Sequence, residues 1–91
     1  MRALADASDR VSLTSYGRTY EGRELYYLTV TAPENHNRLN QIKADNAAFS
    51  DPRVIHSGRM DRLIETLPAV AWLNYSIHGD ELSSTDAGMY V

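Results

Sequence analysis

The sequence predicts a small α/β fold, and three observations support this prediction. Residues 11–31 alternate apolar and polar side chains on both sides of a glycine-containing turn, which is typical of a β-hairpin. Residues 34–48 place apolar side chains at helical spacing. Residues 69–75 form a mostly apolar run that suits a strand covered on both faces. Strands and helices therefore share one chain of 91 residues, which has room for a single small domain.

The first third of the chain is expected to form a short helix followed by the hairpin. Residues 1–8 resemble the end of a helix, because their apolar side chains fall on one side. Residues 11–16 are predicted as a strand, residues 17–22 as the turn, and residues 24–31 as a partner strand rich in Tyr, Leu and Val. The two strands should pair in antiparallel fashion.

The rest of the chain is expected to alternate helices and one strand. A Pro-Glu-Asn start and later helical spacing predict a helix over residues 34–48. Residues 50–67 are marked by the breakers Asp51-Pro52, Ser57-Gly58 and Leu67-Pro68, so only short helical turns are expected there, around residues 62–65. A strand over residues 70–75 and a helix over residues 81–91 complete the prediction.

The composition argues against several classes of function. The formal net charge is −3 and the basic residues are scattered, whereas nucleic acid binding needs a clustered basic face. Cysteine is absent, which excludes disulfides and thiolate metal sites. No apolar run approaches the roughly 20 residues of a membrane span, so no membrane partner is expected. Residues 1–6 do not form a signal peptide, and a secreted or periplasmic location would require a signal in a longer precursor.

The most informative stretch is His78, Gly79, Asp80 and Glu81, directly after the apolar run. A strand would fix the imidazole, Gly79 would let the backbone turn tightly, and the carboxylate three residues on would return to the same ion. Open α/β sheets place their sites at the carboxyl ends of strands. The stretch therefore predicts a metal site with His78 and Glu81 as two ligands. The structural alternative is a Glu that only stabilises the dipole of the following helix.

Three separated segments resemble the zinc carboxypeptidases of the carboxypeptidase A superfamily, in their carboxypeptidase-like branch. The segments are residues 16–25 (YGRTYEGREL), residues 32–42 (APENHNRLNQI) and residues 72–81 (WLNYSIHGDE). Their joint occurrence in this order is far more specific than any one of them. The resemblance implies the N-terminal part of a mixed-sheet α/β fold with flanking helices. Residues 1–91 would then be the N-terminal portion of one peptidase catalytic domain, truncated after the first metal motif.

The resemblance also implies a function. The parent protein would be a zinc metallocarboxypeptidase, with Zn²⁺ as cofactor and a peptide or amide as substrate, that hydrolyses C-terminal peptide bonds. His78 and Glu81 match the first two zinc ligands, and Asp80 stands where many relatives have Asn or Arg. The family's third ligand, its general acid/base Glu and the Arg that holds the substrate carboxylate have no counterpart in the 91 residues. No catalytic residue is therefore expected in this chain, and the chain alone is expected to be inactive.

Other interpretations remain open from the sequence. A non-catalytic fragment or interaction module would keep part of the fold without the activity, and an amidohydrolase would share the metal chemistry. Asp80 is either a solvated turn residue or a group that tunes His78 or a bound water. Residues 83–86 carry hydroxyl groups, but a helix lacks the strained elbow of a serine nucleophile. Residues 70–75 lack cover in a chain this short, so marginal stability or self-association is expected.

Overall fold

A β-hairpin is the only sheet of the computed structural model, which describes residues 1–91. Strands β1 (Val11–Arg18) and β2 (Glu24–Val30) pair in antiparallel register from Val11 opposite Val30 to Arg18 opposite Glu24, with one irregularity between Ser15 and Gly17. The predicted hairpin is therefore confirmed. Its turn is shorter than expected, because residues 17 and 18 extend β1.

The turn of the hairpin is held by local hydrogen bonds. The Thr19 N–H donates to the Arg23 carbonyl over 2.8 Å, and the Gly22 N–H donates to the Thr19 carbonyl over 2.9 Å. Gly22 adopts φ 81°, a left-handed conformation that suits glycine because it has no Cβ. Arg23 also forms an ion pair with Glu21, so these two charged side chains interact with each other within the turn.

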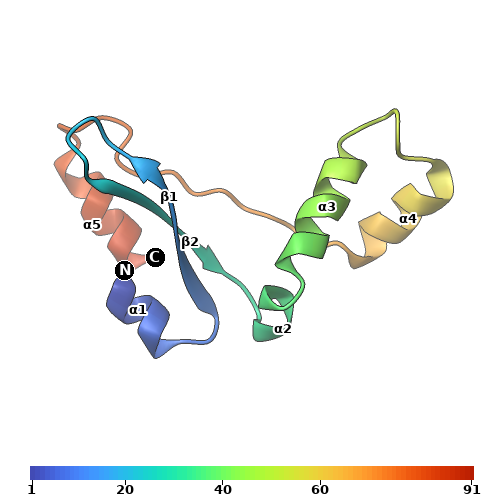
Figure 1. The fold of residues 1–91 in the computed structure, drawn as a ribbon, viewed down its shortest axis with the longest axis horizontal. Coiled ribbons are helices and arrows are strands. Elements are labelled where there is room, and N and C mark those ends of the chain that lie inside the picture. The colour runs from blue at the N-terminus through green and yellow to red at the C-terminus, as the bar shows by residue number, and fades with distance from the viewer.

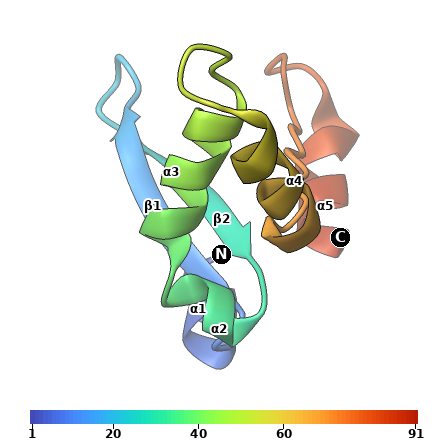
Figure 2. The same cartoon turned by 90° about the vertical axis from the view of Figure 1, so that its right-hand side faces the viewer.

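Five helices surround or follow the hairpin: α1 (Arg2–Ala7), α2 (Pro33–His36), α3 (Leu39–Phe49), α4 (Ser57–Thr66) and α5 (Leu82–Tyr90). The first and last confirm the predicted terminal helices. In Figure 1, the hairpin lies with α1 and α5 at one end of the molecule, and α2, α3 and α4 lie at the other. Figure 2 shows α3 and α4 side by side, where the Arg59 guanidinium and the Asp45 carboxylate approach within 3.4 Å.

Two helix predictions need correction. The single helix expected over residues 34–48 is divided into α2 and α3, because Arg38 leaves the helical region with φ −123° and ψ 18°. The Asn35 side chain favours this break: its amide donates to the Thr31 hydroxyl and its oxygen accepts from Arg38 Nε. Helix α4 spans ten residues where only short turns were expected: Pro52 and Pro68 lie outside it, and Gly58 falls in its first turn without preventing the helix.

The strand predicted over residues 70–75 is wrong. These residues are part of a long extended segment that crosses from α4 back to α5 (Figure 1). No backbone–backbone hydrogen bond involves residues 68–77. The Trp72 ring lies near the Tyr27 ring of β2, with 6.4 Å between centroids, but the two backbones do not form a ladder. A strand needs the backbone of a neighbouring strand at about 4.8 Å. One edge of β2 pairs with β1, and its other edge forms no ladder with residues 70–75.

The core is small. Only Ile42 of α3 and Leu63 of α4 are buried. The radius of gyration is 16.5 Å, whereas a compact domain of this length has about 12 Å. The accessible surface of 7578 Å² exceeds the roughly 5,300 Å² of a compact monomer of this mass by about 2,300 Å².

No helix is both long enough and apolar enough to cross a membrane.

Candidate metal centre

The structure brings together the two side chains that the sequence predicts as ligands. His78 lies in the turn after the extended segment, and Glu81 immediately precedes α5. His78 Nδ1 and Glu81 Oε1 are 2.7 Å apart. The backbone N–H of His78 also donates to Glu81 Oε2 over 3.3 Å. Both carboxylate oxygens of Glu81 therefore face His78.

Glu81 occupies the N-cap position of α5, yet it makes no capping hydrogen bond to that helix. A side chain at this position usually accepts from the backbone N–H of the second or third helical residue. Here the carboxylate turns back to the His78 ring and backbone instead. The carboxylate is therefore directed to His78 and does not cap α5, although its charge still lies near the positive end of the helix dipole.

The turn that carries His78 is fastened to α5 on its other side. The hydroxyl groups of Ser76 and Thr85 are 2.7 Å apart and share a hydrogen bond. The Tyr75 ring packs against Gly88, so closely that a Cβ at residue 88 would lie 3.1 Å from two ring carbons. The Thr85 hydroxyl is thus occupied by Ser76, and the His78 ring is hydrogen-bonded to Glu81. This arrangement offers no support for a serine-type nucleophile.

Gly79 does not have the role that the sequence predicts for it. The turn was expected to need the conformational freedom of this glycine, but Gly79 does not adopt a positive φ. The left-handed residue is Ser76, with φ 54°. A positive φ is uncommon outside glycine, and such strain is found most often where the surrounding structure fixes a site. The hydrogen bond of its side chain to Thr85 holds Ser76 in this conformation.

The electrostatics of the pair favour an ionised carboxylate. The hydrogen bond from the His78 ring, followed by the hydrogen bond from the His78 backbone, lowers the pKa of Glu81 below its usual value. An anionic carboxylate is the form that binds a metal ion. The His78 side chain is 71% exposed and that of Glu81 is 40% exposed. The pair is therefore open to further ligands from outside.

The donor atoms fit the requirements of zinc as a pair. Imidazole nitrogen and carboxylate oxygen each bind zinc at about 2.0–2.2 Å, so two ligands of a tetrahedral ion lie about 3.3 Å apart. The Nδ1 and Oε1 atoms, at 2.7 Å, would have to separate by only about 0.6 Å. The other possible arrangement leaves Nδ1–H on the carboxylate and offers Nε2 to the ion, as in carboxylate–histidine–zinc triads.

A complete site is not assembled within these residues. No group of three or more His, Cys, Asp or Glu side chains could hold a metal ion. His36 belongs to α2, and His56 precedes α4; neither joins the pair. The exposed Asp80 side chain takes no part in the hydrogen bonds between His78 and Glu81.

Comparison with known proteins identifies the family. The model of the zinc carboxypeptidase family matches residues 1–91. The match confirms the resemblance found in the three sequence segments, and it agrees with the α/β class of the structure. No curated protein and no solved structure matches the chain.

Proposed function

This chain belongs to the zinc carboxypeptidase family, and on that premise we propose that His78 and Glu81 are two protein ligands of a catalytic Zn²⁺. The family implies a hydrolase, a zinc metallocarboxypeptidase, whose substrates are peptides. The observation that carries the assignment to these residues is the orientation of Glu81. Its carboxylate makes no capping hydrogen bond to α5, and its Oε1 lies 2.7 Å from His78 Nδ1.

The two residues would hold the ion in complementary ways. His78 supplies a neutral nitrogen, and Glu81 supplies a negative charge, which its lowered pKa preserves to more acidic pH. When bound, zinc polarises a scissile carbonyl and lowers the pKa of its water toward about 7. Asp80, between the two ligands in sequence, would add a second negative charge that tunes the field at His78 and at a bound water.

We also propose that residues 1–91 form the N-terminal portion of a single peptidase catalytic domain. A catalytic zinc usually takes three protein ligands and a water molecule, and this chain offers two donors in one place. The third ligand, the general acid/base Glu and the Arg that holds the substrate carboxylate would come from residues outside these 91. The chain alone would then bind zinc without hydrolysing peptides.

Zinc titration followed by calorimetry tests the assignment. The wild-type chain should bind one zinc ion, and His78→Ala should weaken binding at least about 10-fold, because even loss of an outer partner of a ligand costs about 10–100-fold. His56→Ala is the matched control, since His56 lies at the start of α4 and makes no side-chain cap there. Equal weakening by both substitutions, or none by His78→Ala, would contradict the assignment.

A second candidate function is that of a non-catalytic interaction module that keeps this part of the fold. The lack of a third donor beside His78 and Glu81 is the observation in its favour. Weak zinc binding that does not depend on His78 would support this candidate. For a complete parent protein, cleavage of free C-terminal peptides rather than acylated amino acids would distinguish a carboxypeptidase from an amidohydrolase.

A further inference from the structure

Three side-chain contacts join residues 75–78 to α5, and their order along the two segments is reversed: Tyr75 with Gly88, Ser76 with Thr85, and His78 with Glu81. The partners on the helix side stand at positions 81, 85 and 88, a spacing that places them on one face of a helix. The turn therefore runs antiparallel to α5 along a single face. The candidate donor pair is the last of these three contacts.

The middle contact is made from a backbone conformation that serine seldom adopts. Ser76 has φ 54°, in the left-handed region that glycine enters without steric cost and that other residues avoid. A glycine at this position would supply no hydroxyl group. The hydrogen bond of 2.7 Å to the Thr85 hydroxyl therefore gives a physical reason for a serine here. Strained residues of this kind persist where the surrounding structure fixes a local geometry.

Thr85 also differs from an ordinary helical threonine. A hydroxyl within a helix often bonds to the carbonyl four residues earlier, as Thr66 of α4 does with the Arg62 carbonyl over 2.8 Å. For Thr85 that carbonyl belongs to Glu81. The Thr85 hydroxyl bonds to the Ser76 hydroxyl instead. The hydroxyl pair thus encloses both candidate donors in one loop, residues 76–85.

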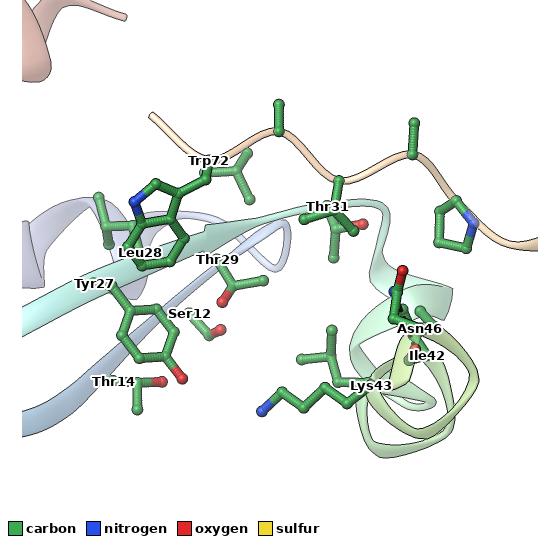
Figure 3. Close-up of a pocket in the computed structure, with 16 residues that line it drawn as sticks. Ser12, Thr14, Tyr27, Leu28, Thr29, Thr31, Ile42, Lys43, Asn46 and Trp72 are labelled. Atoms are coloured by element: carbon green, nitrogen blue, oxygen red, sulfur yellow. Dashed lines mark hydrogen bonds between the residues drawn. The ribbon is translucent and has the colours of Figure 1, made fainter. Parts of the chain in front are cut away.

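The part of the extended segment that precedes the turn gives it little support. A groove of about 580 Å³ lies between residues 68–72 and β2, and Figure 3 shows the segment passing along this strand, with Trp72 near Tyr27. No backbone–backbone hydrogen bond joins the segment to β2. The position of His78 therefore depends on the contacts between the turn and α5 rather than on the hairpin.

We propose that Ser76 and Thr85 are positioning residues of the proposed zinc site, whose hydroxyl pair holds the turn on α5 so that His78 and Glu81 face each other before an ion binds. This inference rests on the assignment of His78 and Glu81 as ligands. A site whose donors are already in place binds more tightly, because binding does not have to order the turn. Zinc affinity should therefore depend on two hydroxyl groups that are not ligands.

Zinc calorimetry on the 91-residue chain tests the proposal with paired substitutions. Thr85→Val keeps the branched shape and removes the hydroxyl, so it should weaken zinc binding about 3- to 10-fold, as expected for one net hydrogen bond. Thr85→Ser keeps the hydroxyl and should bind within about 2-fold of the wild type. Thr66→Val is the matched control, because it removes a helical hydroxyl of α4, and it should bind zinc as the wild type does.

A double-mutant cycle tests whether the two hydroxyls act as one unit. Ser76→Ala removes the other hydroxyl from outside α5, so it provides the same test if Thr85→Val shortens the helix, which circular dichroism at 222 nm would show. Each single substitution and the double substitution should weaken zinc binding by about the same factor. Additive losses in the double variant would overturn the proposal.

A second readout needs no metal. In the zinc-free wild type, a nuclear Overhauser effect should connect the side-chain protons of His78 and Glu81, whose Nδ1 and Oε1 atoms are 2.7 Å apart. The effect should be clearly weaker in Thr85→Val and should be restored in Thr85→Ser. An unchanged effect in Thr85→Val, or no recovery in Thr85→Ser, would refute the positioning role.

The variant His78→Ala separates this inference from the proposed function. If zinc binding falls in His78→Ala and not in Thr85→Val or Ser76→Ala, the ligand assignment stands and the positioning role is refuted. If His78→Ala binds zinc as tightly as the wild type, the ligand assignment fails and this inference fails with it. Losses in all three variants, with Thr66→Val unchanged, are the expected result.

Discussion

Gly88→Ala, next to the candidate site, should have two opposing effects on stability: alanine favours the helix, and its Cβ crowds the Tyr75 ring. Gly88 lies in the last turns of α5, where alanine should stabilise the helix by up to about 1 kcal/mol. The added Cβ would lie 3.1 Å from two carbons of the Tyr75 ring, whereas carbon atoms in good contact are about 3.5–4.0 Å apart. The ring must therefore move by about 0.4 Å.

The structure indicates that the ring can move. Tyr75 is 40% exposed, and its segment has no backbone–backbone hydrogen bond that would resist a small shift. The steric cost should then be about 0.5 kcal/mol, which leaves a net stabilisation of about 0.5 kcal/mol. In the background of Tyr75→Ala the ring is gone, so the same substitution should give the full gain of about 1 kcal/mol.

Urea unfolding followed by circular dichroism at 222 nm, in a four-variant cycle, measures both effects. The coupling between residues 75 and 88 should be about 0.5 kcal/mol and unfavourable. Equal effects of Gly88→Ala in the two backgrounds would refute the close contact. Destabilisation by more than about 1 kcal/mol with Tyr75 present would show that the segment is fixed rather than yielding.

Three further predictions follow from single residues. Ile42→Ala should cost about 2–3 kcal/mol in urea unfolding, at the low end for a buried Ile because Ile42 borders an open groove. The pKa of the Glu24 carboxyl is lowered mainly by the hydrogen bond from Tyr26. The contribution of this group to folding stability should therefore be present above about pH 4.3 and be lost as the pH falls through its lower folded pKa. NMR titration should show a higher Glu24 pKa in Tyr26→Phe than in the wild type. His78→Ala should raise the Glu81 pKa toward its usual value in the metal-free chain, and an unchanged midpoint would contradict the contact.

The hairpin could be predicted because its determinants are local. Alternation over β1 and β2 fixes which side chains share a face, and the glycine with φ 81° closes the turn. The break between α2 and α3 was missed because it depends on the side chain of Asn35, which bonds both Thr31 and Arg38. Helical spacing alone does not reveal such competition from a polar side chain.

The conformation of residues 70–75 could not be predicted correctly, because their apolar pattern is typical of a strand inside a larger sheet. Apolar residues on both faces indicate two covering layers and two neighbouring strands. The structure supplies one nearby strand, β2, and no ladder to it. The sequence pattern thus reports what the segment is suited to, while the structure reports what the 91 residues can provide.

The two predicted donors lie next to each other although the strand predicted before them does not form, and the contacts of α5 explain why. The turn with His78 is tied to that helix by the Ser76 and Thr85 hydroxyls and by the Tyr75 ring on Gly88. None of these contacts involves the hairpin. The spacing of His78 and Glu81 therefore depends on a local turn and helix, which form the donor pair even where residues 70–75 remain unpaired. A third ligand would have to come from beyond this unit, and three-residue spacing carries no information about it.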